Sequence, residues 1–369
     1  MEEEQQNPGG KAGTRKIIKL LLIALSVLAA GAVIGAVVYW NSMLNLLGDP
    51  EQTVPTLSQE EEAALLGTTE PEAPTETTSP EETWPVVVSD ENITNIMLVG
   101  QNFREDEQNK LSDTMILCSI NRETKTLSMV SFMRDTYVKL PPYAGHGPGR
   151  NRMNVCYALG SSWTRTTEGG MEMLALCVEQ NFGIPVHHTI EIGFDTFVSI
   201  IDVLGGVEVD VTEEEAKYMT EEVGYIGEVT AGEQILNGYE TLAYARIREI
   251  DGDRQRTARQ RTVIASLLEK ARGMGLLELH DLATQILPMI LTDMTNTEIT
   301  NYIFEFLPML KNLKIQSLTC PVDNETLKDS CWDKLIDLYG YPSYVLGCNT
   351  QLNGEYLREK LGMEPGEEG

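Results

Sequence analysis

Basic side chains are scarce in this chain of 369 residues, in which 28 Lys and Arg stand against 56 Asp and Glu and the net charge is −28. Such an acidic surface repels the phosphate backbone of nucleic acid, so nucleic acid is not an expected partner. Histidine is rarer still. The four histidines show no metal-ligand spacing, and we expect them to be structural: His146, His187, His188 and His280.

Several catalytic motifs are missing as well. The chain has no Gly-x-Ser-x-Gly, no glycine-rich phosphate loop before a lysine and no Cys-x-x-Cys. These absences argue against a serine hydrolase, a P-loop enzyme and a thioredoxin-like protein. Only six cysteines occur, and Cys118 is expected to be a buried thiol within a strand. Among the three late cysteines, Cys320, Cys331 and Cys348, we predict a disulfide.

One apolar run stands out. Leu20–Tyr39 contains 20 residues without a charge, and at about 1.5 Å per residue a helix of that length spans a ~30 Å hydrocarbon core. Basic residues precede the run, and none follows it before Arg104. This bias predicts a cytoplasmic N-terminus and an extracellular remainder. A cleaved signal peptide is the alternative, and it also places the rest of the chain outside.

The segment that follows is expected to be a tether. Residues 41–92 are rich in Pro, Thr and Glu and contain no Lys or Arg. Such a composition buries little apolar surface and extends through like-charge repulsion. We therefore predict a cytoplasmic tail over 1–16, a membrane anchor over 17–40, a disordered linker over 41–92, a folded domain over 93–362 and a tail over 363–369.

The folded domain has the pattern of an α/β protein. Short apolar runs at Asn95–Gly100, Asp113–Asn121 and Leu127–Met133 predict strands, and further strands are expected near 189–192, 207–211, 315–319 and 344–347. Helices are expected at 171–182, from Phe194 to a stop at the glycine pair Gly205 and Gly206, twice between 276 and 313, and from Asn353. Helices that alternate with buried strands indicate a central mixed sheet covered by helices on both faces.

Six arginines gather in Tyr244–Arg261, "YARIREIDGDRQRTARQR". We read "LAYARIRE" as a strand that places Leu242, Tyr244, Arg246 and Arg248 on one face. "RTARQRTVIASLLEKA" reads as a helix. Its apolar stripe continues at the N-terminal end into Arg256, Arg259 and Gln260.

A buried guanidinium needs an anionic partner. Bidentate binding of phosphate at a helix N-terminus would satisfy this need. A structural network with Glu249, Asp251 and Asp253 is the alternative. The sequence leaves both open.

Several motifs together resemble the LytR–CpsA–Psr family. They occur in order as "NIMLVGQNFR", "LSDTMILCSIN", "VSFMRDTYV", "DVLGGVEVDV", "LNGYETLAYARIRE" and "RQRTARQRTVI". The resemblance implies a membrane-anchored phosphotransferase. Such an enzyme moves a glycopolymer, a teichoic acid or capsular polysaccharide, from a polyprenyl-pyrophosphate carrier to peptidoglycan through a phosphodiester. It also implies an apolar tunnel for the polyprenyl tail and a magnesium ion beside the pyrophosphate.

Carried onto this chain, the resemblance implies roles for individual residues. Asp113 is the expected magnesium ligand, because Mg²⁺ prefers oxygen donors. Gln260 would orient a phosphate oxygen or an arginine, and Asp135 is expected to be a structural partner of an arginine rather than a base. The pyrophosphate would be bound by Arg134, Arg152, Arg246, Arg248 and Arg256, of which Arg134, Arg246 and Arg248 also join Asp113 in catalysis.

Two positions depart from the family pattern. Asn102 stands where an aspartate is common, so this second metal ligand brings no charge, and Leu111 replaces an arginine. Both changes keep an alternative open, namely a relative that binds or hydrolyses polyprenyl pyrophosphate with an impaired metal site. A non-catalytic envelope regulator is the remaining class.

Overall fold

The computed structural model describes residues 84–101, 111–224, 226–338 and 341–363, together with residues 42, 62 and 65. The chain divides into two compact units, 1–46 and 47–369, and every element below belongs to the second. Within the described residues, no helix is long and apolar enough to cross a bilayer. The predicted anchor Leu20–Tyr39 and Asn102 lie outside these residues, and so does most of the predicted linker.

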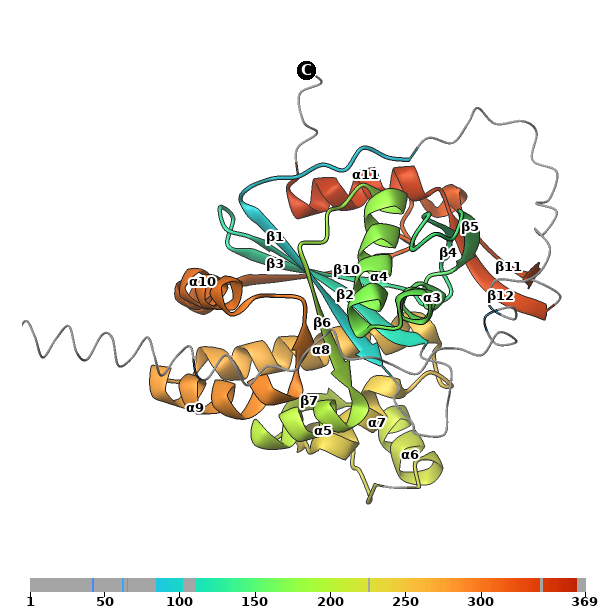
Figure 1. The fold of residues 1–369 in the computed structure, drawn as a ribbon. Coiled ribbons are helices and arrows are strands. Elements are labelled where there is room, and N and C mark those ends of the chain that lie inside the picture. The colour runs from blue at the N-terminus through green and yellow to red at the C-terminus, as the bar shows by residue number, and fades with distance from the viewer. Residues whose placement is uncertain are drawn as a thin grey trace, which may run out of the picture. The chain divides into compact units, whose positions relative to one another are not determined.

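A mixed sheet of six strands forms the centre of the fold, in the order β10-β3-β2-β1-β6-β9 (Figure 1). Its strands are β1 (Ile93–Gln101), β2 (Ser112–Asn121), β3 (Thr126–Phe132), β6 (His188–Gly193), β9 (Leu291–Thr292) and β10 (Lys314–Cys320). The pairs β1/β6 and β3/β10 are parallel, and the other neighbours are antiparallel. The strands predicted from the apolar runs are confirmed.

Three smaller two-stranded sheets lie around this centre: β4 (Tyr137–Leu140) with β5 (Gly149–Arg152), β7 (Val207–Val211) with β8 (Gly232–Leu236), and β11 (Cys331–Leu338) with β12 (Tyr341–Cys348). The helices are α3 (Val155–Thr164), α4 (Thr167–Phe182), α5 (Phe194–Val203), α6 (Glu213–Glu222), α7 (Gly238–Arg246), α8 (Asp253–Arg272), α9 (Leu276–Ile286), α10 (Asn296–Phe306) and α11 (Thr350–Leu361). Short 3₁₀ turns are η1 (Leu287–Met289), η2 (Leu307–Asn312) and η3 (Lys328–Ser330).

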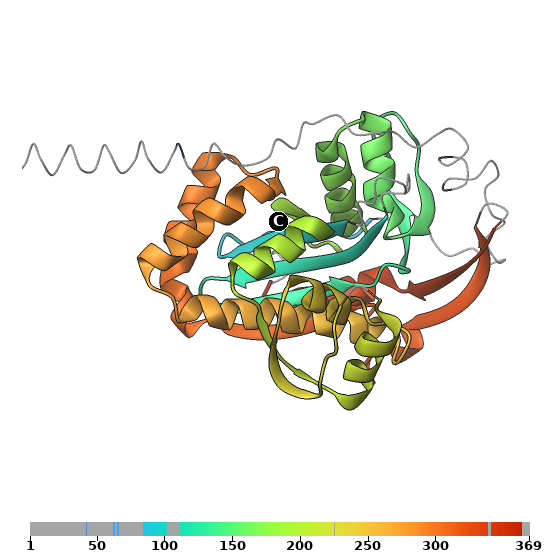
Figure 2. The ribbon, with the colours of Figure 1, turned by 90° about the horizontal axis from the view of Figure 1, so that it is seen from below.

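Helices cover both faces of the central sheet, as the sequence predicted. On one face, sheet residues such as Met97 and Leu117 share a core with α3, α4 and α11. On the other face, Ile116 and Met129 pack against Ile264 and its neighbours on α8. Figure 2 shows α3 and α4 on one side of the strands and α8 on the other. Successive side chains of β2 and β3 therefore enter two cores, one on each face of the sheet, and both cores are closed by helices.

The predicted strand at Leu242–Arg248 is wrong. These residues form the end of α7 and the loop after it. Asn237 and Glu240 make a capping box in which the Asn237 side chain accepts from the Glu240 amide and Glu240 accepts from the Asn237 amide. This cap starts a helix, so Arg246 and Arg248 do not share a strand face.

The predicted disulfide among Cys320, Cys331 and Cys348 is also wrong, because all six cysteines are free. Cys331 does face Cys348 across the β11–β12 ladder. Burial raises the pKa of the Cys320 thiol well above its usual value, and the neighbouring thiol of Cys348 adds to this effect. Since the thiolate is the reactive form, this burial disfavours the reaction that would form the bridge.

Glycines allow α3 and α4 to pack closely. A Cβ added at Gly160 on α3 would lie 2.2 Å from the carbonyl oxygen of Gly169 and 2.4 Å from the Cβ of Met173, both on α4. We expect Gly160→Ala to force the helices apart and to lower the free energy of unfolding by about 1–3 kcal/mol. A thermal melt measures this change as a fall in Tm of roughly 2–4 °C per kcal/mol. Gly147→Ala is the control, since nothing lies within 4 Å of its added Cβ; an equal loss in both variants would contradict the packing argument.

Candidate functional site

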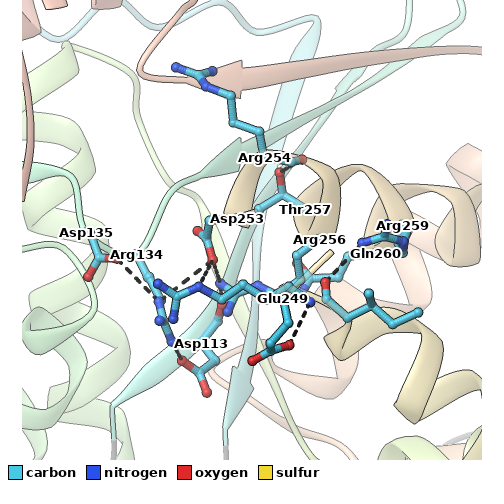
Figure 3. Close-up of polar contacts among 12 residues, drawn as sticks. Asp113, Arg134, Asp135, Glu249, Asp253, Arg254, Arg256, Thr257, Arg259 and Gln260 are labelled. Carbon is cyan, nitrogen blue, oxygen red and sulfur yellow. Dashed lines mark hydrogen bonds and ion pairs between the residues drawn. The ribbon is translucent and has the colours of Figure 1, made fainter. Parts of the chain in front are cut away.

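The first half of the site forms where β2 begins and β3 ends. The antiparallel register pairs Ile116 with Ser131, and continuing this register beyond the ladder brings Asp113 opposite Arg134. The Arg134 guanidinium donates to Asp113 Oδ1 at 2.8 Å (Figure 3). Two residues that the sequence placed in separate motifs are therefore brought together by strand pairing.

The second half comes from the N-terminus of α8. Gly252 precedes this helix with φ of 87°, a left-handed value that favours glycine. Asp253 is the first helical residue, and Arg256 follows one turn later. Nη2 of Arg256 lies 2.8 Å from Asp253 Oδ1 and donates to the backbone oxygen of Asp113 at 3.1 Å. Arg256 therefore connects the start of α8 to the start of β2 (Figure 3).

Asp253 is the centre on which the arginines converge. Its Oδ1 lies 3.8 Å from Arg134 Nε and 3.9 Å from Arg248 Nε, in addition to the contact with Arg256. These longer distances are electrostatic contacts rather than hydrogen bonds. At 2.8 Å the Arg256 pair is a close ion contact, although neither of the buried carboxylate oxygens of Asp253 has a well-directed hydrogen bond. Three guanidinium groups thus share one carboxylate mainly through charge.

A further pair extends the group toward β5. Arg152, the last residue of β5, places Nη1 3.4 Å from Asp135 Oδ1, and Arg134 Nε lies 3.5 Å from Asp135 Oδ2. Asp135 is buried between these two cations, in keeping with the predicted structural role. We call the whole group the site cluster: Asp113, Arg134, Asp135, Arg152, Arg248, Asp253 and Arg256.

The site cluster has an excess of positive charge, with four arginines and three aspartates. Burial lowers the pKa of Arg256, and the nearby charge of Arg134 lowers it further against the opposing effect of Asp253. Burial acts in the same direction on Arg134, but its hydrogen bond to Asp113 and the surrounding carboxylates raise its pKa overall. Both guanidiniums remain protonated. Arg256 is the less well compensated cation, and a bound anion would stabilise it.

The remaining predicted residues lie outside this group. Arg246 is exposed on the last turn of α7, with its guanidinium 4.8 Å from the centroid of the Phe194 ring. Gln260 is half-buried on α8; its amide nitrogen lies 3.4 Å from the Ala245 oxygen, and its amide oxygen is buried without a partner. Leu111 packs against the apolar core beside the site. Asn102 cannot be placed, because it lies outside the described residues.

Arg259 serves the structural network that the sequence left open. Its Nε donates to Glu215 on α6 at 2.6 Å, and a second nitrogen binds Asp251. Together with Thr212 and Tyr244, these residues border a cavity of about 540 Å³ between α6 and α8. The lining is largely polar, so this cavity is not the apolar tunnel that the resemblance implies. That tunnel stays a prediction.

The oxygen donors of the site cluster fit a magnesium ion that also binds substrate. Among the described residues, no three His, Cys, Asp or Glu side chains lie together as a metal site. Magnesium commonly uses one or two carboxylates and completes its shell with water and substrate phosphates. Asp113 provides one such carboxylate, with about a third of its side chain exposed. Asp253 is the poorer candidate, because Arg256, Arg134 and Arg248 already lie against its carboxylate.

Asp253 is the residue whose importance the sequence reasoning underestimated. It entered only as a possible structural partner, yet it contacts three arginines. The signal was present in its spacing: Asp253 and Arg256 are three residues apart at the start of a helix, where such side chains are neighbours. An aspartate in the first turn also complements the helix dipole.

The chain is similar in sequence to a known protein family and to several characterised bacterial enzymes. Residues 57–336 match the model of the LytR_cpsA_psr family. The TagU polyisoprenyl-teichoic acid–peptidoglycan teichoic acid transferase of Bacillus licheniformis is 32% identical over 183 residues, which are 49% of this chain and 53% of that protein. TagT of Bacillus subtilis, named for the same transfer, is 27% identical over 229 residues, 61% of this chain and 67% of TagT. The match thus spans about half the length of TagU.

Solved structures share the fold. A structure of TagT bound to LIIa-WTA superposes with a TM-score of 0.57 at 20% identity, covering 78% of this chain and 98% of that one. Protein gbs0355 from Streptococcus agalactiae superposes with a TM-score of 0.60 at 23% identity, covering 75% and 90%. At these identities the likeness establishes the arrangement of the sheet and helices.

Proposed function

This chain belongs to the LytR–CpsA–Psr family, and from this premise we propose that it transfers a glycopolymer from a polyprenyl-pyrophosphate carrier to peptidoglycan. The observation that carries the proposal is the site cluster, in which four arginines from four segments meet beside an exposed edge of Asp113. A diphosphate is the chemistry that such an arrangement accommodates, because guanidinium groups bind phosphate oxygens in a bidentate manner. TagU and TagT, which resemble this chain, are named for teichoic acid transfer, so a teichoic acid is the proposed polymer.

The proposed reaction is a phosphoryl transfer. A hydroxyl oxygen of peptidoglycan forms a bond to the phosphorus that carries the glycopolymer, and the bond from that phosphorus to the lipid phosphate breaks. Polyprenyl monophosphate leaves, and the proton of the hydroxyl passes to an oxygen of this departing phosphate. Arg256 and Arg134 bind the oxygens on which charge develops, and this fixed positive charge lowers the barrier. Arg248 and Arg152 neutralise the remaining charge from the two sides.

We extend the proposal to a magnesium ion held by Asp113, with Asn102 as a further oxygen ligand. When bound, the ion would neutralise phosphate charge during transfer. We also propose that Leu20–Tyr39 anchors the chain in the membrane with the folded domain outside the cell, where peptidoglycan lies. The uncharged run and the basic residues before it support this location.

A transfer assay tests the function. The full chain is supplied with lipid-linked teichoic acid, peptidoglycan and Mg²⁺, and the products are separated. Covalent attachment of polymer to peptidoglycan supports the proposal. Release of lipid phosphate without attachment would instead support the hydrolytic alternative. Asn102 and Leu111 favour that alternative, because both depart from the family pattern. Tight binding of the donor without either product would indicate a non-catalytic regulator.

The metal assignment has its own test. Asn102→Asp adds a carboxylate to the proposed ligand set, and we expect Mg²⁺ to bind about tenfold more tightly in the presence of pyrophosphate. Isothermal titration measures this affinity without activity. Asn92→Asp is the matched control, since it adds the same charge directly before β1, at the end of that strand far from the site. An unchanged titration for Asn102→Asp would count against the assignment.

A further inference from the structure

The β11–β12 hairpin presents an exposed apolar face. In its antiparallel register Leu335 lies opposite Tyr344, and Asp333 lies opposite Leu346. Residues opposite each other point to the same side of a two-stranded sheet. Leu335 is 66% exposed and Tyr344 is 46% exposed. We call this side the hairpin face: Asp333, Leu335, Asp337, Pro342, Tyr344 and Leu346.

The opposite side of the hairpin packs in part against the rest of the protein, while Trp332 on that side stays 42% exposed. Val345 is fully buried there, and the Trp332 ring lies 6.3 Å from that of Tyr137 on β4. A Cβ at Gly347 would lie 2.0 Å from the Trp332 ring, so the ring packs flat against the β12 backbone. Within the part of the chain that the structure describes, Leu335 and Tyr344 of the hairpin face therefore stay exposed to solvent.

The hairpin face begins at the site cluster. The amide of Leu346 donates to the backbone oxygen of Asp135 at 2.8 Å, and Leu346 forms a β-bridge with Thr136. The carboxylate of Asp135 contacts Arg134 and Arg152 of the site cluster. Figure 1 shows the hairpin projecting from β4 and β5, beyond the edge of the central sheet. A molecule that lies along this face therefore has one end at the arginines.

The charge of the hairpin face restricts its ligand. It carries the carboxylates of Asp333 and Asp337 and no lysine or arginine. A polymer with repeated phosphates, as in the proposed donor, would be repelled. A glycan of N-acetylated sugars carries no phosphate, offers hydroxyls to carboxylates and has apolar C–H faces that pack on aromatic rings.

The polar groups of the face suit such a sugar. The Tyr344 hydroxyl donates to Asp333 Oδ2 at 2.5 Å, which fixes the ring and leaves the other carboxylate oxygen for a sugar hydroxyl. This hydrogen bond, burial and the charges of Asp333 and Asp135 raise the pKa of Tyr344 to about 12. The phenol thus stays neutral, and its ring keeps the character of an apolar stacking surface.

We propose that the hairpin face binds the glycan strand of the peptidoglycan acceptor and directs a sugar hydroxyl toward the site cluster. This inference rests on the proposed function and names the surface that serves its second substrate. Leu335 and Tyr344 supply the apolar platform, and Asp333 positions the sugar through its hydroxyls.

The test compares the full chain with two double variants. Leu335→Ala/Tyr344→Ala removes the platform, and Leu277→Ala/Phe304→Ala removes two apolar side chains from α9 and α10 that are more exposed than those of the platform. The probe is a tetrasaccharide of alternating N-acetylglucosamine and N-acetylmuramic acid whose lactyl carboxyls are capped as simple amides, so that it is uncharged like the sugar backbone of intact peptidoglycan. We expect its Kd to rise about tenfold in the first double variant only. Inorganic pyrophosphate should bind all three proteins equally, and Tyr344→Phe should retain most of the sugar affinity because it keeps the ring.

The outcomes separate this inference from the proposed function. Failure of the full chain to bind the tetrasaccharide, or an unchanged Kd in the platform variant, overturns the inference even when transfer to peptidoglycan occurs. Platform-dependent binding in a protein that never transfers polymer upholds the glycan surface and overturns the proposed function. A raised acceptor KM with unchanged donor binding upholds both.

Discussion

Replacing Arg256 with alanine is expected to lower the rate of polymer transfer by about 10²- to 10³-fold, the loss typical when one positioned donor to a charged transition state is removed. Arg256 is 5% exposed and reaches both Asp253 and the Asp113 backbone. Its incomplete compensation by carboxylates leaves it ready to bind a phosphate oxygen. Arg256→Lys keeps the charge but not the planar fork, so we expect it to recover only part of the rate.

Arg254→Ala is the matched control for this experiment. Arg254 lies on the same helical turn but points away from the site cluster and donates to the Pro321 oxygen at 3.2 Å (Figure 3). Transfer by this variant should stay close to that of the unmodified chain. Thermal melts of both variants separate a catalytic loss from unfolding, because Arg256→Ala also leaves Asp253 with one fewer cation. Equal rates for Arg256→Ala and Arg254→Ala would contradict the assigned role.

Replacing Arg259 with methionine is expected to produce the largest loss of stability, about 3–5 kcal/mol, because it leaves a buried carboxylate without its cation. The Arg259 side chain is 6% exposed and the Glu215 side chain 9%. Its contacts with Glu215, Asp251 and the Ile247 oxygen connect α8 to α6 and to the loop after α7. Urea unfolding at pH 7 measures the change. Lys217→Met removes an exposed α6 cation, 4.0 Å from Glu221, and should cost less than about 1 kcal/mol.

Acid titration gives an independent signature of this pair. Burial alone would raise the pKa of Glu215, but hydrogen bonds from Arg259 and Thr212 outweigh it, and the pKa falls below its ordinary value of 4.5. A lowered pKa in the folded state adds stability above pH 4.5 that is lost as the pH falls below it. In Arg259→Met this contribution disappears. The variant should therefore lose less stability than the unmodified chain between pH 5 and pH 3, and an identical pH profile would contradict the pairing.

The sequence predicted the central elements because their signals are local. Buried side chains recur along Ile93–Gln101 and Ser112–Asn121, and these runs became neighbouring strands. The glycine pair after α5 also ended that helix as expected, with φ of 74° and 89° at Gly205 and Gly206. The strand predicted at Leu242–Arg248 was wrong because Arg246 and Arg248, two residues apart, have the spacing of side chains on one strand face. The prediction overlooked the capping box at Asn237, which starts a helix.

The site was only partly predictable because its contacts are long-range. Asp113 and Arg134 meet through strand register, which no motif encodes, and Arg152 reaches Asp135 through the β4–β5 pairing. The helix prediction correctly placed Arg256 and Arg259 on the buried side of α8. It could not distinguish their partners: Arg259 is neutralised by Glu215 and Asp251, while Arg256 shares Asp253 with two other cations.

Helix α8 is fixed at both ends. At its C-terminal end Lys270 donates to the oxygens of Gly205 and Gly206 at 3.2 Å, and Arg272 donates to the Leu310 oxygen at 2.9 Å. At its other end Arg256 is fastened to β2. These contacts hold the two ends of α8 to different parts of the fold. In the proposed reaction, α8 therefore keeps Arg256 in place, and the segments that carry Arg134, Arg152 and Arg248 are the parts expected to move when the donor enters and leaves.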